Sequence, residues 1–114
     1  MKFTVSLKNN YDFRRLYNRG KSAGTHRLLI YCRKVNRPYS RVGYTVSTKL
    51  GCAVKRNRVR RRLREIYRLN EARFVPGCDI VVVVRKGGFE AAYRDLETDF
   101  IRLAKKLGIM AVEQ

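Results

Sequence analysis

The stretch KRNRVRRRLREIYR, Lys55 to Arg68, holds eight lysine or arginine residues and a single carboxylate, Glu65. At 100° per residue its apolar side chains fall on one arc of about 100°, the stripe that a core-facing helix needs. These apolar residues are Val59, Leu63, Ile66 and Tyr67. The opposite side gathers Asn57, Arg60, Arg61, Arg64 and Arg68, with Arg58 at the flank. We therefore predict a helix that packs by one side and presents cations on the other.

The alternative is a solvated surface, which is what most runs of charge form. Arg60 and Arg64, and likewise Arg64 and Arg68, are like charges four residues apart, and each such pair costs roughly 0.2–0.5 kcal/mol. Lys55 and Arg56 lie near the predicted N-terminus, where the helix dipole disfavours cations. Stability alone would not select this arrangement. Because the planar fork of arginine suits phosphate oxygens, the pattern points to nucleic acid as the partner.

Composition favours the same class of partner. A chain of 114 residues suits a single domain, residues 1–114, and its 45% hydrophobic share is that of a folded protein. Twenty-seven basic residues against nine acidic ones give a net charge of +18, which is typical of proteins that bind polyanions. No apolar run could span a membrane and no signal peptide is evident, so we expect a cytoplasmic protein without a membrane partner.

The sequence shows no catalytic or metal-binding motif. His26 is the single histidine, the carboxylates are dispersed, and no glycine-rich phosphate loop precedes a helix. Cys32, Cys52 and Cys78 contain no C-x-x-C pair, so we expect three reduced thiols packed as small apolar residues. If the protein takes part in catalysis, a partner must supply the reacting groups. RNA with bound Mg²⁺ could do so, and we expect no small-molecule substrate.

The N-terminal part predicts a short helix that is capped by Asn9 or Asn10 and ends at Gly20. Its apolar residues Phe13, Leu16 and Tyr17 have helical spacing. Such a triplet is usually core; alternatively, the aromatic rings could stack on the unpaired bases of single-stranded RNA. Before this helix, the alternation in residues 3–7 suggests an extended segment.

Two segments have strand composition and are separated by turn-forming residues: Arg27–Val35 and Arg41–Thr48. We expect them to form an antiparallel pair. The second segment alternates an apolar face with a face of small and polar residues that could admit a ligand. Cys78–Arg85, CDIVVVVR, is typical of a strand buried on both faces, and we expect it to run parallel to the second segment, with the basic helix crossing between them.

After Lys86–Gly88 the chain predicts a last helix whose apolar residues repeat every three or four positions and pack on the core. They are Phe89, Tyr93, Leu96, Phe100, Leu103 and Leu107. Asp95, Glu97 and Asp99 do not converge as metal ligands would. We expect these three carboxylates to face solvent, with Arg94 and Arg102 available to pair with them.

Taken together, four segments resemble the protein subunit family of bacterial ribonuclease P, and the similarity covers nearly the whole chain. YDFRRLYNRGKS (Tyr11 to Ser22) is similar to its first helix, and RVGYTVSTKLG (Arg41 to Gly51) to its strand-and-turn segment. AVKRNRVRRRLRE (Ala53 to Glu65) resembles its central basic helix, and DIVVVVRKG (Asp79 to Gly87) its last strand.

The resemblance implies an α+β fold, an α-β-β-β-α-β-α sandwich around one central mixed sheet. It requires a third strand between Ser22 and Thr48 and leaves Lys2 to Leu7 extended at the start. It also implies a left-handed crossover through the basic helix, against the usual right-handed rule.

The resemblance further implies that an RNA subunit with Mg²⁺ holds the catalytic centre, while the protein binds that RNA and the 5′ leader of precursor tRNA. Phe13, Tyr17 and Tyr31 match positions that line a cleft for the leader. Arg58, Arg60, Arg61 and Arg64 match the basic helix near the catalytic RNA. Arg56 and Asn57 complete the R-N-R motif, although the helical wheel places Arg56 on the apolar side, where it would brace the start of the helix. The remaining predicted RNA contacts are Lys49, Lys55 and Arg68.

Two positions depart from the family pattern. Thr48 stands where lysine is frequent, and Cys52 stands where asparagine is frequent, so a phosphate contact and a helix cap are not expected here. Composition alone also fits a ribosomal or general RNA-packaging protein, and a stand-alone protein nuclease is a third possibility. The motif set favours the ribonuclease P subunit over both.

Overall fold

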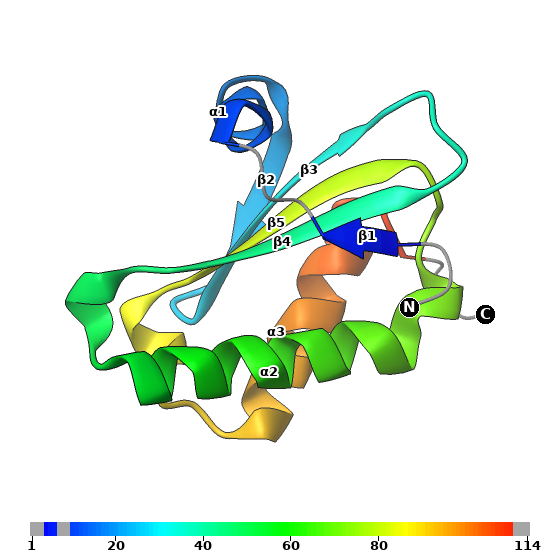
Figure 1. The fold of residues 1–114 in the computed structure, drawn as a ribbon. Coiled ribbons are helices and arrows are strands. Elements are labelled where there is room, and N and C mark those ends of the chain that lie inside the picture. Colours follow the sequence, from blue (N-terminus) through cyan, green and yellow to red (C-terminus); the bar gives the residue numbers. More distant parts are fainter. Residues whose placement is uncertain (1–3, 7–9, 111–114) are drawn as a thin grey trace.

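A computed structural model describes residues 4–6 and 10–110, with three α-helices and five strands (Figure 1). The elements in chain order are β1 (Thr4–Ser6), α1 (Asn10–Arg19), β2 (Lys21–Gly24), β3 (Leu28–Lys34), β4 (Ser40–Val46), α2 (Ala53–Asn70), β5 (Cys78–Val84) and α3 (Tyr93–Lys106). Short 3₁₀ turns lie at Thr48–Leu50, Glu71–Arg73 and Lys86–Gly88. Of the predicted extended start, Lys2, Phe3 and Leu7 lie outside the described residues, as does the predicted cap Asn9.

The five strands form one mixed sheet in the order β1-β4-β5-β3-β2. β5 is parallel to β4 and antiparallel to β3, β2 is antiparallel to β3, and β1 is parallel to β4. The third strand implied by the resemblance is therefore β2, and the α+β sandwich around a mixed sheet is confirmed. The parallel pair joined by the basic helix is confirmed as well.

The predicted antiparallel pairing of Arg27–Val35 with Arg41–Thr48 is wrong, because β5 lies between β3 and β4. The physical reason is the composition of β5 itself. A run of β-branched residues gains most when strands flank it and both its faces are covered, and Ile80, Val81 and Val82 have no exposed surface. β3 and β4 instead use this strand as a common partner.

The connection from β4 through α2 to β5 is a crossover between neighbouring parallel strands. In Figure 1, β4 lies in front of β5 and α2 runs beneath both, so the connection is left-handed, as the resemblance implies. α2 begins directly after Cys52, whose side chain makes no capping hydrogen bond.

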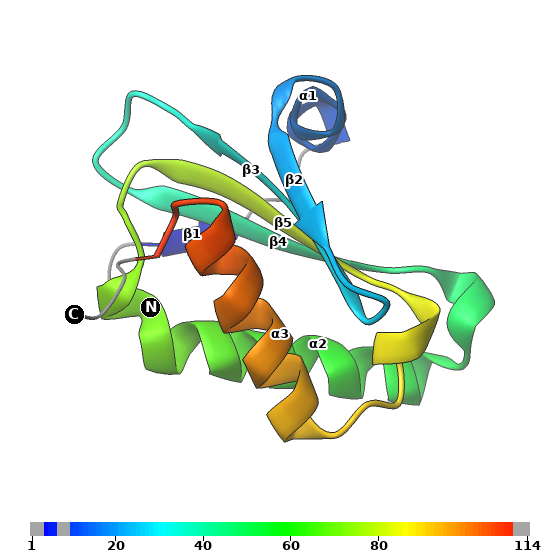
Figure 2. The same cartoon turned by 180° about the vertical axis from the view of Figure 1, so that it is seen from behind.

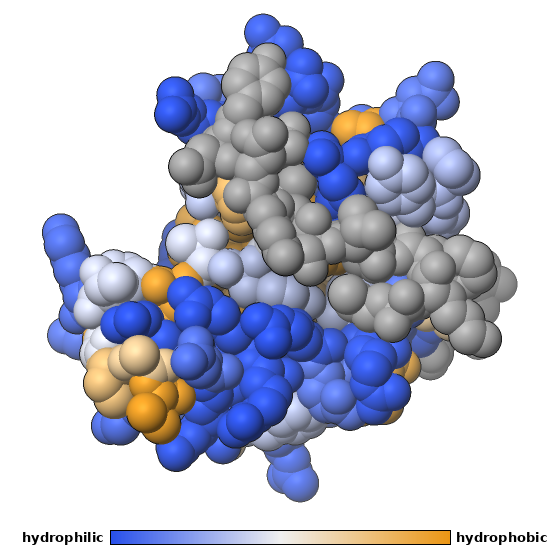
Figure 3. Space-filling view, in the orientation of Figure 1, coloured by the Kyte–Doolittle hydropathy of each residue, from blue (hydrophilic) through white to orange (hydrophobic). Residues whose placement is uncertain are grey.

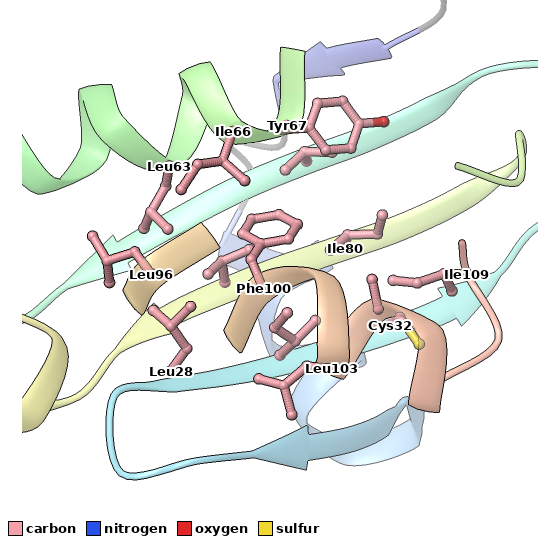
Figure 4. Close-up of a cluster of buried hydrophobic side chains, with 14 of the residues drawn as sticks. Leu28, Cys32, Leu63, Ile66, Tyr67, Ile80, Leu96, Phe100, Leu103 and Ile109 are labelled. Carbon is pink, nitrogen blue, oxygen red and sulfur yellow. The ribbon is translucent and has the colours of Figure 1, made fainter. Parts of the chain in front are cut away.

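The two faces of the sheet are covered unequally. α2 and α3 pack on one face, and α1 lies over the other (Figures 1 and 2). The main core lies under α2 and α3, where side chains of both helices meet those of β3 and β5 (Figure 4). The buried residues of α2 are Val59, Leu63, Ile66 and Tyr67, so the predicted apolar stripe is confirmed in full.

The last helix confirms the predicted core packing but corrects one of its carboxylates. Leu96, Phe100 and Leu103 are buried, while Phe89 precedes the helix. Asp99 does not face solvent: it is 3% exposed and accepts hydrogen bonds from the Thr25 hydroxyl at 2.9 Å and from the Arg27 guanidinium at 3.2 Å.

These contacts of Asp99 are tertiary, since both partners are more than 70 residues away in the chain. The turn between β2 and β3 lies over α3, so it brings Thr25 and Arg27 to Asp99, and they replace the Arg94 and Arg102 that spacing suggested as partners.

The cysteines also need one correction. Cys32 and Cys78 are buried, as expected, but Cys52 is exposed at the start of α2.

Candidate nucleic-acid interface

The side of α2 turned away from the core carries the predicted cations. We call Asn57, Arg58, Arg60, Arg61, Arg64 and Arg68 the arginine ridge; all are exposed except Arg60, which is half-buried. Most of the surface along α2 is accordingly hydrophilic in Figure 3, apart from a hydrophobic patch at the beginning of the helix. Since the stripe on the other side of α2 is fully buried, the helix is held rigidly while the ridge remains accessible.

The cations of α2 differ in what their side chains already contact. Arg68 pairs with Glu65 one turn earlier, and Lys55 pairs with Glu90 in the segment before α3. Hydrogen bonding to Glu90 raises the pKa of Lys55, and hydrogen bonding to Glu65 raises the pKa of Arg68. These two ion-paired cations lie near the two ends of α2.

The side chain of Arg56 is engaged in a contact within the protein. Its Nη1 donates a hydrogen bond of 2.7 Å to the carbonyl of Gly51, in the turn that leads into α2. This contact agrees with the inference that Arg56 braces the start of the helix. Arg60 donates to the side-chain oxygen of Asn57 at 3.0 Å, so these two members of the ridge are oriented together.

A cleft opens where α1, the edge of β4 and α2 approach one another. It measures about 440 Å³ and is lined by Phe13, Arg14, Tyr17, Tyr44, Thr45, Val46 and Arg60. The cleft follows from the sheet register. β1 pairs with Ser40 to Val42 only, and no described strand pairs on that side with the rest of β4, so its last residues form an open edge.

The aromatic residues of α1 form the wall of this cleft. Leu16 is buried against Val81, and Phe13 and Tyr31 pack beside that pair. Tyr17 is 41% exposed and meets Tyr31 edge-on, with ring centroids 4.8 Å apart. Tyr17 therefore presents a held but accessible ring, which is the arrangement that stacking on an unpaired base requires.

The structure thus joins two features that are separate in the sequence. Phe13 and Tyr17 share the cleft with Arg60, so an aromatic wall and a cation of the arginine ridge face one space. Tyr31 supports Tyr17 and does not line the cleft itself. Lys49 is exposed in the turn before α2 and does not line the cleft.

Four cleft residues are absent from the predicted site: Arg14, Tyr44, Thr45 and Val46. Thr45 belongs to the small and polar face of its strand, which was the sequence signal for a ligand. No such signal marks Tyr44, which belongs to the apolar face of the same strand. Its ring is half-buried and its hydroxyl is buried without a hydrogen-bond partner.

The described residues contain no group of three or more histidine, cysteine, aspartate or glutamate side chains that could hold a metal ion. Within the same part of the chain, no helix is long and apolar enough to cross a membrane.

Comparison with known proteins gives one consistent result. The family model described as Ribonuclease P matches residues 1–108. A ribonuclease P protein component of Clostridioides difficile is 43% identical over 107 residues, covering 93% of this chain and 94% of that protein. One from Alkaliphilus metalliredigens is 38% identical over 111 residues, covering 97% of this chain and 100% of that protein.

Two solved structures have the same fold. The RNase P protein of Staphylococcus aureus has a TM-score of 0.86 at 26% identity and covers 94% of this chain and 98% of its own. The RNase P protein of Thermotoga maritima has a TM-score of 0.81 at 30% identity, covering 96% and 98%.

Proposed function

The chain belongs to the ribonuclease P protein family, and on this premise we propose that it is the protein component of that endoribonuclease and does not itself cleave the phosphodiester bond. Its task is to bind the catalytic RNA subunit and the 5′ leader of precursor tRNA in the cytoplasm. The observation that carries this proposal is the shared space of Phe13, Tyr17 and Arg60, where rings for bases and a cation for phosphates face the same cleft.

The cleft suits a single strand. A duplex keeps its bases stacked inside, whereas an unpaired leader can place a base on the exposed ring of Tyr17 while Arg60 contacts the backbone. Each stacked base contributes roughly 1–3 kcal/mol of binding free energy. Affinity for the precursor therefore comes from nucleotides that the mature product lacks.

The arginine ridge has a different task. Its exposed guanidinium groups neutralise phosphates, which screens the repulsion between the RNA subunit and its RNA substrate. The described residues do not fit a protein-held metal site, because they bring no three ligating side chains together. We therefore assign the Mg²⁺ of the reaction to the RNA.

The test is the substitution Phe13→Ala in protein reconstituted with the cognate RNA subunit. We expect binding of leader-bearing precursor tRNA to weaken about 5-fold to 150-fold, the equivalent of 1–3 kcal/mol, with binding of mature tRNA nearly unchanged. Equal losses for both RNAs would remove the leader cleft from the proposal.

Two further outcomes would overturn the proposed function as a whole. Mg²⁺-dependent cleavage of precursor tRNA by protein freed of RNA would make the protein a nuclease. Ribosomal RNA as the dominant RNA recovered with the purified protein would favour the packaging alternative.

A further inference from the structure

A second pocket lies at the end of β3, toward the opposite edge of the sheet from the cleft, which lies at β4. It measures about 240 Å³, and four of its lining side chains are cationic: Arg19, Lys21, Arg33 and Lys34. Leu107 and Ile109, which follow α3, also line the pocket. We call it the β3-edge pocket. No part of the proposed function uses it.

The pocket follows from the register of β2 and β3. Pairing begins at Lys21, opposite Cys32, so the last two residues of β3 extend beyond the start of β2 and leave an open edge. Gly20 makes the close turn from α1 possible. A Cβ at Gly20 would lie 2.7 Å from the carbonyl oxygen of Leu16 and 2.8 Å from that of Cys32. The end of α1, with Arg19, therefore lies close to the open edge of β3.

Within the described part of the chain, the charge in this pocket is not balanced. No carboxylate lines it, and none of its four cations forms an ion pair among residues 4–6 and 10–110. Arg33 has a carboxylate as its register partner on β5, Asp79, but Asp79 is already paired with Arg37 and Arg41.

Arg33 supplies the second observation. Its Nη1 is buried and has no hydrogen-bond partner. A buried guanidinium nitrogen without an acceptor is unfavourable, so such groups are rare unless a ligand or water completes them. Arginine is also the side chain best suited to phosphate oxygens. The anion is indicated by the pocket itself, whose lining holds four cations and no carboxylate among the described residues.

We propose that the β3-edge pocket binds a phosphate group of RNA at a site separate from the cleft. The inference rests on the proposed function, since it takes RNA as the partner. The volume is below the 300–1,000 Å³ usual for organic ligands, which favours a small anionic group.

The phosphate bound here differs from those of the leader nucleotides in the cleft. β5 separates β3 from β4, and two strand spacings amount to about 10 Å. Along the strands, Lys34 is level with Cys78, whereas Tyr44 is level with Val82, an offset of about 13 Å for four residues. The protein would thus contact RNA at two sides of its sheet, and we assign the second contact to the RNA subunit.

The first arm of the test uses inorganic phosphate as the probe and the free full-length protein. We expect phosphate to shift the backbone amide resonances of Arg33 and Lys34, and the substitution Arg33→Gln to abolish these shifts. Lys34→Gln serves as a second variant, because Lys34 is exposed and its replacement leaves the core untouched. Arg94→Gln removes the same charge from an exposed position outside the pocket and is the matched control.

The second arm measures binding of the RNA subunit against salt concentration. Each lost phosphate contact should reduce the slope of log affinity against log salt by about 0.7–0.9. We expect that reduction for Arg33→Gln and Lys34→Gln beyond any change in Arg94→Gln, with an unaltered preference for precursor over mature tRNA.

The outcomes separate the sources of the anion. Phosphate shifts with an unchanged RNA slope would mean a free-anion site and overturn the RNA assignment. No shifts and no change of slope relative to Arg94→Gln would overturn the pocket altogether. Loss of the leader preference in the wild-type protein would instead be a failure of the proposed function.

Discussion

The two faces of the sheet are built from the same strands but for different purposes. Beneath α2 and α3, a continuous core buries leucine, isoleucine, valine and aromatic side chains (Figure 4). On the face under α1, the buried cluster formed by residues whose burial the structure describes is Leu16 with Val81, and Phe13, Tyr31 and Val83 are partly covered. The covered face holds the fold together, while the open face leaves aromatic rings accessible.

This difference explains why a small protein can present so many unpaired cations. Burial of apolar surface contributes about 25 cal/mol per Å², and nearly all of it is concentrated beneath α2 and α3. The repulsion along the arginine ridge is therefore tolerated by a helix whose other side is anchored. Substitutions on the two faces should separate stability from RNA binding.

The largest effect is expected in the core. Phe100→Ala removes a ring with no exposed surface that packs against Phe74, with ring centroids 6.0 Å apart. We expect the free energy of unfolding to fall by about 3–5 kcal/mol, measured by denaturant titration. Phe13→Ala, on the open face, is the matched control, and it should lower the free energy of unfolding clearly less. Similar losses for both variants would contradict the difference between the two faces.

The next effect concerns the ion cluster at the start of β5. Asp79 is 4% exposed and accepts hydrogen bonds from Arg41 at 3.0 and 2.7 Å, and from Arg37. Burial raises the pKa of its carboxyl, but the two guanidinium groups outweigh burial and hold the pKa below its ordinary value. We expect Asp79→Asn to destabilise the fold by about 2–3 kcal/mol at pH 7.

The pH dependence of this effect has a definite sign. A carboxylate whose pKa is lower in the folded state stabilises the fold above its unfolded pKa of about 3.9, and this stabilisation is lost as pH falls through the folded pKa. The difference in the free energy of unfolding between wild type and Asp79→Asn should therefore be constant near neutrality and become smaller below about pH 4. Glu65→Gln, which breaks an exposed pair on α2, should leave stability unchanged. A gap that widens in acid would contradict this assignment.

A smaller effect, confined to binding, is expected on the open face. Tyr17→Ala should cost roughly 1–3 kcal/mol in affinity for leader-bearing precursor tRNA, because it removes an exposed stacking surface. Its matched control is Tyr39→Ala, since Tyr39 is 39% exposed but lies under Arg37, in the loop between β3 and β4. Competition binding with precursor and mature tRNA provides the measurement. An equal loss in the control would show that any surface tyrosine suffices.

The smallest effect should have opposite signs for stability and binding. Arg64 lies between Arg60 and Arg68 on the arginine ridge, so Arg64→Gln relieves two like-charge contacts of roughly 0.2–0.5 kcal/mol each at low salt. Thermal unfolding should show a slight gain in stability. Binding to the RNA subunit should weaken, with a salt slope reduced by about 0.7–0.9. A loss of stability instead would mean that Arg64 supports the fold.

Local patterns in the sequence were sufficient for most elements. The spacing of Val59, Leu63, Ile66 and Tyr67 predicted the buried side of α2, and the composition of Cys78–Arg85 predicted a doubly covered strand. These predictions hold because periodicity reports directly on which side of an element is buried. The position of Arg56 on the helical wheel likewise anticipated its contact with Gly51.

Predictions that depend on pairing or on distant neighbours were less secure. The prediction that Asp99 faces solvent failed because its partners, Thr25 and Arg27, are more than 70 residues away in the chain, where helical spacing gives no information about them. The pairing of β3 with β4 failed because strand composition does not specify which strand lies between two others. Tyr44 was missed as a cleft residue because alternation placed it on the apolar face of its strand, whereas the ligand was expected on the polar face; the open edge of β4 exposes that part of the strand to the cleft.

The amino-acid sequence by itself determined the helical faces, the buried central strand, the family and the preference for a polyanion, because each depends on residue types at short, regular spacing. Only the tertiary structure decided which side chains from different elements line the same cleft or pocket. The cleft and the β3-edge pocket both arise where a strand extends beyond its neighbour. Register is a property of paired strands, so no single segment of the chain encodes it.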